Sequence, residues 1–416
     1  MSKTAEILSI GTELLLGNIA NTDAQDISQG LSELGINVFF HSVVGDNPER
    51  IKSAVEIAKS RADIIITTGG LGPTFDDITK ETVAACFGKK LVVHEPSMEK
   101  IKSYFNSRPN VKITENNFRQ AWLPEGCTVL ENDWGTAPGV AFEANGQYVI
   151  MIPGPPRECR PMFKYRAMPY LAALSDSVLV SRNVRVFGMG ESQMEATLYD
   201  MISTYTNPTV APYAKDGECM LRVTAKAKSR EEAFAMTEPV VEEIKRILKD
   251  VVYGVDVESL EEVVSNLLRE RGMTISTAES CTGGLLSARI TSLPGSSDIF
   301  KGSVCSYANE IKVKVLGVPA EDIKKYGAVS EPVARAMAEN VRKLMETDIG
   351  VSITGVAGPA ESEAKPVGTA FIGVSSEKGT NVIGVNLGRG DRAKVRTAAG
   401  HRALETVRRH ILGIKD

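Results

Sequence analysis

A serine and a lysine in the C-terminal half of the chain could form a catalytic pair. Ser280 lies in a run of small polar residues, and Lys312 follows it downstream. A serine hydroxyl is a weak nucleophile until a base takes its proton. Residues 256–400 contain no histidine, so a Ser-His-Asp arrangement would need His401 or His410. Lys312 is therefore the better candidate base, and the pattern predicts attack on a carbonyl carbon.

The elements expected around Ser280 would place it at a turn from a strand into a helix. Met273–Thr277 is β-branched and apolar, which predicts a buried strand, and Leu285–Ile290 has a helix-forming composition. The first amides of such a helix point outward without partners, and Gly283 and Gly284 would let a substrate oxygen approach them. The turn therefore predicts an oxyanion hole.

Lys312 is expected in the first turn of a second helix. Asn309 resembles an N-cap, residues 310–316 follow as the helix, Gly317 ends it, and Tyr307 ends the preceding strand. A positive charge there opposes the helix dipole, and partial burial would lower the lysine pKa further. Plainer explanations stay open, because serine and threonine often only cap helices and surface lysines are usually solvated.

The residues from 256 to 416 also contain several motifs in a fixed order. They are Thr277-Ala-Glu-Ser-Cys-Thr-Gly-Gly284, Gly295-Ser-Ser297, Tyr307-Ala-Asn-Glu310 with Lys312, Gly327-Ala-Val-Ser-Glu-Pro332, Thr354-Gly-Val-Ala-Gly-Pro359, Lys365-Pro-Val-Gly-Thr369 and Gly390-Asp-Arg392. Together they closely resemble the PncC-type nicotinamide mononucleotide deamidase domain at the C-terminus of CinA proteins. The resemblance implies a Ser/Lys amidohydrolase with Ser280, Tyr307 and Lys312 as catalytic residues.

Further substrate contacts in this domain are expected from the motif residues and from the last helix. The candidates for oxyanion and substrate binding are Cys281, Thr282, Gly283, Gly284, Thr354, Gly355, Gly358, Arg392 and Arg396. The two arginines, four apart at the start of a helix over Asp391–Ile411, are either solvated surface or face a substrate phosphate. The chain departs from the family after Pro359, where Ala360-Glu-Ser-Glu-Ala-Lys365 replaces the usual Asp-Gly-Gly. A changed loop there could weaken nucleotide binding.

The N-terminal half alternates strands and helices, which predicts a parallel sheet covered on both faces. Strands are expected at Ala5–Ile10, Asn37–Val44 and Ala62–Thr68, with helices at Asn21–Leu34 and Pro48–Lys59. Ligands bind at the carboxyl ends of such strands. The loops there offer glycine amides for phosphates, and Asp46, Asp76 and Asp77 as oxygen ligands for a bridging divalent cation. Simple turns and helix caps are the alternative.

Three motifs of this half are Gly11-Thr-Glu-Leu-Leu-Leu-Gly17, Thr67-Thr-Gly-Gly-Leu-Gly-Pro-Thr-Phe-Asp-Asp-Ile-Thr79 and Gly135-Thr-Ala-Pro-Gly139. They resemble the N-terminal half of CinA, which is similar to the molybdopterin-binding domain of MoaB and MogA proteins. The resemblance implies a three-layer domain with metal-dependent ADP-ribose pyrophosphatase activity that uses Mg or Co, with K as a further cation. Asp23 stands where the family has Asn.

The nucleotide-binding candidates of this half come from its glycine loops and from the proline-rich turn Pro153-Gly-Pro-Pro-Arg-Glu158. They are Gly11, Thr12, Glu13, Asn18, Gly69, Gly70, Gly72, Thr74, Gly154 and Glu158.

Between these halves, residues 168–255 predict a small α+β unit. Strands are expected at Asn183–Phe187 and Met220–Lys226, and helices at Glu191–Ile202 and Arg230–Lys249. Gly188-Met-Gly-Glu191 is only weakly similar to a phosphate loop. We interpret the unit as a connector or dimerisation element, and divide the chain into domains at 1–167, 168–255 and 256–416.

Composition limits the other classes of function. The 416 residues have 48 basic and 52 acidic side chains and a net charge of -4, which gives no electrostatic case for nucleic acid. No apolar run is long enough to span a bilayer, and the N-terminus lacks a signal peptide. The six cysteines are scattered without CxxC pairs, which favours reduced thiols in a cytoplasm.

Together these observations predict a cytoplasmic, homodimeric, bifunctional hydrolase whose ligands are nicotinamide mononucleotide, ADP-ribose and AMP, without membrane or direct nucleic-acid partners. Two alternatives stay open. One is a regulatory protein of competence or DNA damage that keeps the pockets without turnover. The other is molybdopterin binding or adenylyl transfer by the N-terminal half.

Overall fold

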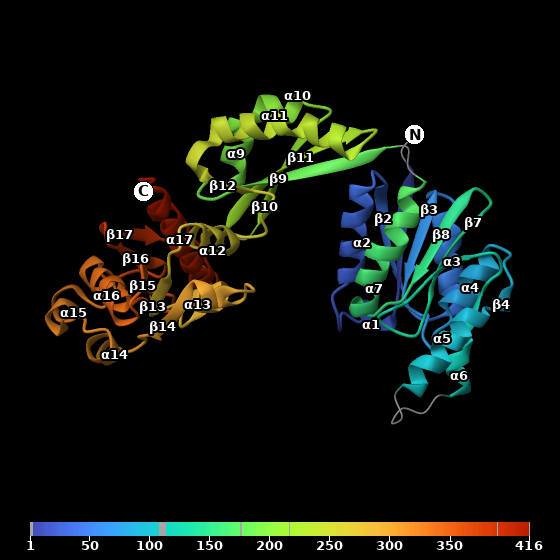
Figure 1. The fold of residues 1–416 in the computed structure, drawn as a ribbon, viewed down its shortest axis with the longest axis horizontal. Coiled ribbons are helices and arrows are strands. Elements are labelled where there is room, and N and C mark those ends of the chain that lie inside the picture. The colour runs from blue at the N-terminus through green and yellow to red at the C-terminus, as the bar shows by residue number, and fades with distance from the viewer. Residues whose placement is uncertain (1–2, 108–113, 175–176, 216, 389, 416) are drawn as a thin grey trace. The chain divides into compact units, whose positions relative to one another are not determined.

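The computed structural model describes residues 3–107, 114–174, 177–215, 217–388 and 390–415. The chain forms two compact units (Figure 1), residues 1–181 with 224–237, and residues 182–223 with 238–416. The six-stranded sheet and its hydrophobic cluster lie in the first unit, and the five-stranded sheet and its cluster lie in the second. The expected fold class is confirmed, since an N-terminal α/β unit, a small α+β sheet and a C-terminal α/β sheet are all present.

The N-terminal sheet has six strands in the order β2-β1-β3-β8-β7-β6. Their bounds are Thr4–Ile10 (β1), Asn37–Val44 (β2), Ile64–Thr68 (β3), Thr128–Leu130 (β6), Gly139–Ala144 (β7) and Gln147–Ile152 (β8). The first four strands of this order run parallel, and β7 and β6 are antiparallel additions. The loops that follow β1, β2, β3 and β8 therefore leave the same edge of the sheet.

Helices cover both faces of this sheet, as the alternating pattern predicts (Figure 1). On one face, α2 (Thr22–Glu33) and α7 (Pro156–Met162) pack against one cluster of buried strand residues. On the other face, α3 (Pro48–Lys59) and α4 (Thr79–Cys86) pack against a second cluster. The loops at the carboxyl edge thus stand on a rigid, doubly covered sheet.

A separate two-stranded sheet and a further helix also belong to this unit. Strands β4 (Leu91–Val93) and β5 (Trp122–Pro124) pair with each other, and α5 (Glu95–Asn106) lies between them in sequence.

The C-terminal sheet has the strand order β14-β13-β15-β16-β17. Its strands are Ile275–Glu279 (β13), Phe300–Cys305 (β14), Ile349–Gly355 (β15), Thr369–Ser376 (β16) and Gly379–Asn386 (β17). The first three run parallel, and β16 and β17 follow as an antiparallel hairpin. The carboxyl ends of β13, β14 and β15 consequently meet at one edge.

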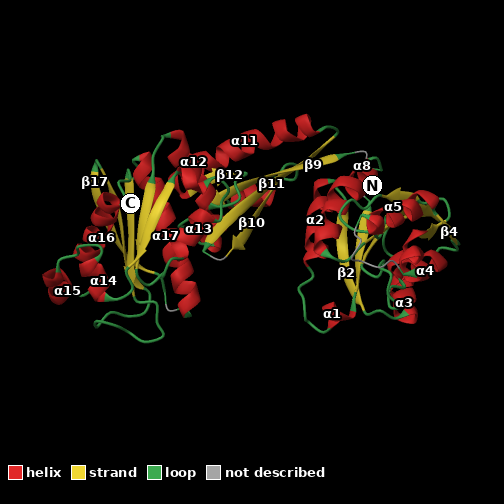
Figure 2. Cartoon of the chain, turned by 60° about the horizontal axis from the view of Figure 1, so that its bottom comes forward, coloured by secondary structure: helices red, strands yellow, loops and turns green. Residues whose placement is uncertain are grey.

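Four helices cover the two faces of this sheet (Figure 2). They are α12 (Leu260–Glu270), α13 (Leu285–Thr291) and α17 (Arg392–Leu412) on one face, and α16 (Glu331–Leu344) on the other. Close packing of α16 depends on small strand residues, because a Cβ atom on Gly350 would come within 2.2 Å of the Ala338 carbonyl oxygen.

The side-chain alternation of β13 separates two neighbouring residues of the serine motif. Ile275, Thr277 and Glu279 face α13, while Ser276 and Ala278 face α16. Glu279 accordingly points to the start of α13. Ser280, one residue on, turns to the other face, where Lys312 lies.

The small α+β unit forms a sheet in the order β10-β11-β9-β12. Its elements are Val178–Val186 (β9), Glu191–Thr197 (α9), Tyr199–Thr204 (α10), Thr209–Lys215 (β10), Glu218–Ala227 (β11), Arg230–Leu248 (α11) and Val252–Val255 (β12). The single helix expected over Glu191–Ile202 is wrong, because Leu198 separates two short helices.

In the described part of the chain, no helix combines the length and apolar character needed to cross a membrane.

Candidate functional site

The structure brings Ser280 and Lys312 into contact. The Lys312 Nζ lies 3.1 Å from the Ser280 Oγ, and also donates to the backbone carbonyl of Ser306 at 2.7 Å. Only 1% of the lysine surface is exposed. This distance is within hydrogen-bond reach, which is the geometry required of a base and its nucleophile.

Burial controls the protonation of this site. Desolvation lowers the pKa of Lys312, and the opposing electrostatic effects of Cys281, Glu363 and Cys305 only partly offset it. The neighbouring thiol behaves in the opposite way, since burial raises the pKa of Cys281 to about 11. The raised pKa favours the thiol form of Cys281 at neutral pH, so Ser280 stays the candidate nucleophile of this turn.

The helix that carries Lys312 differs slightly from expectation. Helix α14 spans Asn309–Lys314, and its N-cap is Ala308, so the expectation of Asn309 as the cap is wrong. Strand β14 ends at Cys305, two residues before Tyr307. Lys312 lies in the first turn and its amide bonds the Ala308 carbonyl. The Lys312 side chain extends toward the segment that precedes α14, where its Nζ donates to the Ser306 carbonyl.

Glu279 corrects the expectation that the helix amides after Ser280 are free. Its buried carboxylate accepts from the amides of Gly284, Leu286 and Ser287 at 3.0, 3.1 and 2.9 Å, and from the Ser287 hydroxyl. The start of α13 is thus already capped from within the protein.

The expected oxyanion hole would therefore have to use amides that precede Gly283. The Gly283 amide donates to the Ser280 carbonyl at 3.0 Å. In the described structure, no other residue accepts from the amides of Cys281 and Thr282. These two amides directly follow the nucleophile and are the remaining donors for a developing oxyanion. Gly283 and Gly284 instead adopt φ angles of 59° and 93°, which glycine favours.

Tyr307 does not approach Ser280 through its hydroxyl. The ring is 58% exposed, and the hydroxyl accepts a hydrogen bond from Arg392. Its link to Ser280 and Lys312 is the backbone carbonyl, which lies 3.5 Å from the Lys312 Nζ. The structure thus joins Tyr307 to an arginine instead of to the nucleophile.

The two arginines of α17 reach the loops of the site. Arg392 donates to the Gly358 carbonyl at 2.7 Å, and Arg396 donates to the Thr282 carbonyl at 2.6 Å. Of the two alternatives for these residues, a position at the site is the one that the geometry supports. Each guanidinium has five N–H donors, so donors remain for an anionic group.

Thr354 and Gly355, predicted as substrate contacts, have structural partners instead. The buried Thr354 hydroxyl donates to the Ala328 carbonyl at 2.8 Å. A Cβ atom at Gly355 would meet the Ala370 Cβ at 2.8 Å. Both residues therefore serve the packing of β15, whereas Gly358 contacts Arg392 through its carbonyl.

The unusual loop after Pro359 is a tight turn held by Glu363. Ser362 and Lys365 exchange backbone hydrogen bonds of 3.3 and 2.9 Å across it. The Glu363 carboxylate accepts from the amides of Ala328 and Val329 at 2.9 and 3.0 Å. Glu363 and Ala364 have φ angles of 54° and 55°, the left-handed region in which glycine is favoured. The turn is thus anchored but strained.

Replacing Ala364 by glycine should stabilise the C-terminal domain by about 0.5–1 kcal/mol, because relief of the left-handed strain outweighs the opposing gain of entropy in the unfolded chain. The change in the free energy of unfolding would be measured by denaturant titration, with hydrogen exchange of peptides from β15 and β16 as the probe. Ala360→Gly is the matched control, since Ala360 is not in the left-handed region. Equal destabilisation by both substitutions would contradict the expectation.

Neither histidine of α17 takes the place of Lys312. His410 bonds Ser376, and the strand register puts Ser376 at the end of the sheet opposite to Ser280. His401 packs against Gly217, where a Cβ atom would lie 3.1 Å from its Nδ1.

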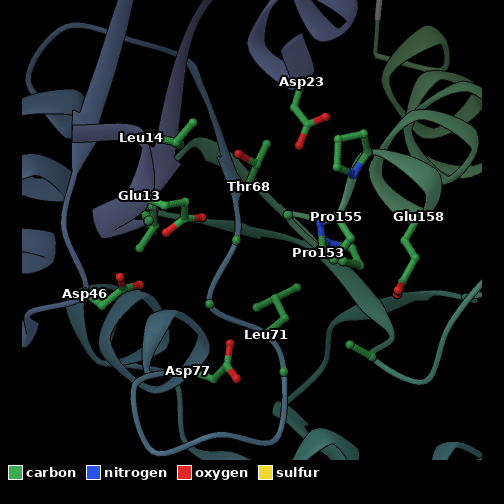
Figure 3. A pocket seen from close by; sticks show the side chains of 18 of the residues that line it. Glu13, Leu14, Asp23, Asp46, Thr68, Leu71, Asp77, Pro153, Pro155 and Glu158 are labelled. Atoms are coloured by element: carbon green, nitrogen blue, oxygen red, sulfur yellow. The ribbon is translucent and has the colours of Figure 1, made fainter. Parts of the chain in front are cut away.

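The N-terminal unit has a cavity of about 490 Å³ at the carboxyl edge of its sheet (Figure 3). Loops after β1, β2, β3 and β8 line it, as the parallel order requires. The predicted residues that line it are Gly11, Glu13, Asp46, Gly69, Gly70, Gly72, Thr74, Asp76, Asp77, Gly154 and Glu158. Two predicted residues, Thr12 and Asn18, do not line it.

Two of the acidic residues are each held by a threonine. The Thr12 amide and hydroxyl both donate to one oxygen of Asp46 at 2.8 Å. The Thr74 amide and hydroxyl donate to one oxygen of Asp77 at 2.8 and 2.6 Å. The second oxygen of each carboxylate has no such bond. Thr12 therefore acts through Asp46 and not directly on a ligand.

The glycines of this edge are required by close contacts. A Cβ atom on Gly69 would lie 2.1 Å from the Ile10 carbonyl oxygen, and one on Gly72 would lie 2.4 Å from Asp77. Glu158 is buried and accepts from the Asn132 amide at 2.8 Å. A Cβ atom at Gly135 would meet that carboxylate at 1.9 Å. Glu158 thus fixes the wall of the cavity.

Asp23, where the sequence departs from the family, also lines the cavity, together with Thr68, Gln120 and Thr136, which the sequence analysis did not name as candidates. Gln120 lies far along the chain in no recognisable motif, so no local signal indicates it. Lys80, which is also buried, donates to the carbonyls of Arg119 and Gln120 at 3.0 and 3.2 Å. Burial lowers the pKa of Lys80 to about 8.

The resemblance implies a divalent cation, and the N-terminal cavity offers only part of the ligands that such a cation needs. Among the described residues, no three His, Cys, Asp or Glu side chains converge on one point. Asp46 and Asp77 each keep one oxygen without a threonine donor. Mg²⁺ typically binds one or two carboxylates and completes its shell with water and substrate phosphates. The donor set therefore fits a cation that binds together with a nucleotide.

Three family models match consecutive parts of the chain. Residues 6–173 match the probable molybdopterin binding domain, residues 181–254 the damage-inducible protein CinA KH domain, and residues 257–411 the CinA C-terminal domain. The similarity of the middle segment to a KH domain was not recognised from the sequence. KH domains clamp nucleic acid with a GXXG loop, and the glycines of residues 181–254 contain no such spacing.

Full-length relatives agree with these matches. A CinA-like protein of Dictyoglomus turgidum is 52% identical over 98% of this chain and 99% of its own length. A CinA-like protein of Dictyoglomus thermophilum is 53% identical with the same coverage. A putative competence-damage inducible protein of Acetivibrio thermocellus is 49% identical over 99% of both chains. Because relatives about half identical to this chain cover nearly its whole length, the chain belongs to the CinA family.

Proposed function

We propose that residues 256–416 form a Ser/Lys amidohydrolase that converts nicotinamide mononucleotide to nicotinate mononucleotide and ammonia. The observation that carries this proposal is the buried Lys312 amine, 3.1 Å from the Ser280 hydroxyl. Burial favours the neutral amine, which is the form that can accept a proton. The substrate class comes from the resemblance of the motifs, and the reaction type from the geometry.

The acylation step follows from this arrangement. The Ser280 Oγ bonds to the carboxamide carbon while its proton moves to the Lys312 Nζ. The amides of Cys281 and Thr282 hold the oxyanion, a contribution of roughly 3–4 kcal/mol. The carbon–nitrogen bond then breaks, and Lys312 returns the proton to the leaving nitrogen, which departs as ammonia.

Deacylation uses the same groups in reverse. Water gives a proton to Lys312 and adds to the ester carbon of the acyl-enzyme. When that intermediate collapses, the Ser280 oxygen leaves and recovers a proton from Lys312, which yields the carboxylic acid. Arg392 and Arg396 would bind the phosphate of the nucleotide, since both reach the rim of this site.

The N-terminal cavity supports a second activity. We propose that it cleaves ADP-ribose to AMP and ribose 5-phosphate with Mg or Co, and that Asp46 and Asp77 hold the cation while Asp76 supports Thr74. When bound, the cation would neutralise the phosphates and polarise the bond that breaks. The glycine amides of the β3 loop would position the phosphates.

A paired assay tests both proposals. Wild type, Ser280→Ala and Asp77→Ala are each given nicotinamide mononucleotide with ammonia monitored, and ADP-ribose with Mg²⁺ or Co²⁺ and AMP monitored. We expect each substitution to lower one activity at least a thousandfold and to spare the other, so that each variant is the control for its partner.

The alternatives give different results in the same assay. No ammonia from the wild type would leave a regulatory protein without amidase turnover. Intact ADP-ribose together with tight binding of a pterin would favour the molybdopterin or adenylyl-transfer function of the N-terminal half.

A further inference from the structure

The Glu363 carboxylate joins two loops of the C-terminal domain. Its two oxygens accept from the amides of Ala328 and Val329 at 2.9 and 3.0 Å. The loop after Pro359 is thereby tied to residues 327–330, the segment that leads into α16. The Glu363 side chain is 28% exposed, whereas Ala328 and Val329 are buried. Hydrogen bonds from backbone amides to a carboxylate are roughly twice as strong as those between neutral groups.

The backbone at Gly327 leaves the space that this carboxylate occupies. A Cβ atom on Gly327 would lie 2.3 Å from the Glu363 Oε2, which is a steric clash. The φ angle of Gly327 is 81°, in the region that glycine favours. The Ser330 hydroxyl donates to the Gly327 carbonyl at 2.7 Å and so closes the segment on itself. The contact between the two loops therefore has a defined geometry.

Hydrogen bonds lead from this contact to the nucleophile turn. The Ala328 carbonyl accepts from the Thr354 hydroxyl at 2.8 Å, and both residues are buried. Thr354 follows Ile353 on β15, and the Ile353 carbonyl accepts from the Ser280 amide at 2.9 Å. A shift of residue 328 would therefore move the end of β15, to which the backbone of Ser280 is bonded.

The same loop reaches the lysine of the site by a second route. It begins at Gly358, whose carbonyl accepts from Arg392 at 2.7 Å. Arg392 also donates to the Tyr307 hydroxyl, and the Tyr307 carbonyl lies 3.5 Å from the Lys312 Nζ. One end of the loop is thus connected to Lys312, and the end that carries Glu363 is connected to Ser280.

Glu363 also acts on Lys312 through its charge. Burial lowers the pKa of Lys312, and Cys281, Glu363 and Cys305 oppose this effect. Of these three groups Glu363 is the carboxylate, which is ionised at neutral pH. The titratable groups that act on Lys312 or on its neighbour Cys281 are Glu279 and Cys281 of the nucleophile turn, Cys305 of β14, Arg392 of α17 and Glu363.

We propose that Glu363 is a positioning residue of the amidase site, which fixes the Ser280 turn through residues 327–330 and places a negative charge near Lys312. This proposal rests on the proposed amidase function. Glu363 does not touch the reacting atoms in it, and its effect reaches the reaction through Ser280 and Lys312. Loss of the carboxylate should loosen the turn and let the neutral amine form at a lower pH.

The kinetic test follows ammonia release from nicotinamide mononucleotide by the full-length protein across a range of pH. In Glu363→Ala, kcat/KM should fall about tenfold or more, the factor expected for one lost hydrogen bond to a charged group. Glu363→Gln keeps one accepting oxygen and should lose less. In both variants the rise of kcat/KM with pH should level off at a lower pH than in the wild type, because a charge that stabilises the ammonium form is removed.

Glu361→Gln is the matched control, because it removes the same charge from an exposed position of the same loop. It should keep the wild-type kcat/KM and the wild-type pH profile. A role of Glu363 in supporting the loop alone would change the rate and leave the pH profile as it is.

Hydrogen exchange gives a readout that needs no turnover. Peptides covering residues 276–286 and 326–334 should exchange faster in Glu363→Ala than in the wild type and in Glu361→Gln. If the wild type releases no ammonia but the 276–286 peptide exchanges faster in Glu363→Ala, the amidase function fails while the positioning of the turn is supported. Unchanged exchange of that peptide, or a pH profile of Glu363→Gln equal to that of an active wild type, would overturn the proposal.

Discussion

Lys312→Met should lower kcat/KM for nicotinamide mononucleotide by about 10³-fold to 10⁴-fold, at the upper end of what a general base contributes. Methionine fills the space of the lysine stem but cannot take the proton of Ser280. Replacing the buried amine removes a desolvation penalty and breaks no ion pair among the described residues, so the domain should stay folded. Single-turnover measurement of ammonia would show that the acylation step is lost.

The pH dependence gives this prediction a second readout. Burial lowers the pKa of Lys312, so the neutral amine forms below the ordinary value of 10.5. In the wild type, kcat/KM should rise tenfold per pH unit until the pH reaches that lowered pKa, and then level off. This rise of kcat/KM with pH should be absent from the residual activity of Lys312→Met.

Stability should change with pH in the same direction. The unfolded chain binds the Lys312 proton more tightly than the folded chain, so the burial penalty is fully present below the folded pKa. It disappears as pH rises from the folded pKa to 10.5. The contribution of Lys312 to this rise in stability should vanish in Lys312→Met.

Lys314→Met is the matched control, because Lys314 lies on the same short helix but is exposed. Lys314→Met should keep the wild-type kcat/KM and the wild-type rise of kcat/KM with pH. Full amidase activity in Lys312→Met would remove Lys312 as the base, whatever the distance to Ser280.

Local sequence patterns predicted most of the framework. Buried strands such as Ile64–Thr68 and helices such as Pro48–Lys59 have clear periodicity and caps, and the structure has them within a few residues. The parallel order then places the loops after β1, β2 and β3 at one edge without further information. The cavity of the N-terminal unit follows directly from this topology.

The proximity of Ser280 and Lys312 could be inferred because each lies just beyond the end of neighbouring strands. The parallel strands β13 and β14 pair from Ile275 to Glu279, and their carboxyl ends are adjacent. The sequence pattern could not show which hydrogen-bond partner each polar group of these turns has. The amides after Ser280 were expected to be free, yet Glu279 binds them, because the alternation of β13 directs it to α13.

Contacts between distant segments were the hardest to foresee. The motif pattern predicts Thr354 as a substrate contact, but its hydroxyl donates to the Ala328 carbonyl. Tyr307 is expected beside Ser280, but its hydroxyl accepts a hydrogen bond from Arg392. Both outcomes depend on the tertiary position of loops far apart in sequence. Propensity carries no information about such pairs, and only the packed fold decides them.

Glu279→Ala should destabilise the C-terminal domain by about 3 kcal/mol, because three amides and one hydroxyl lose a shared buried acceptor. The same change should lower amidase activity strongly, since Ser280 follows Glu279 directly and its position depends on this turn. Glu279→Gln keeps one accepting oxygen but presents an N–H group to donors, so an intermediate loss is expected.

Hydrogen exchange separates this local effect from general damage. Peptides covering residues 280–292 should exchange faster in Glu279→Ala, and peptides of the N-terminal unit should not change. Trp122 and Trp134, the two tryptophans of the chain, both lie in the N-terminal unit, so their fluorescence should report an unaltered unfolding transition. Glu310→Ala, at an exposed site near Lys312, is the control. If exchange at residues 284–287 were the same in Glu279→Ala and wild type, the carboxylate would not be what holds the nucleophile turn, and the amides of α13 would again be available to a substrate.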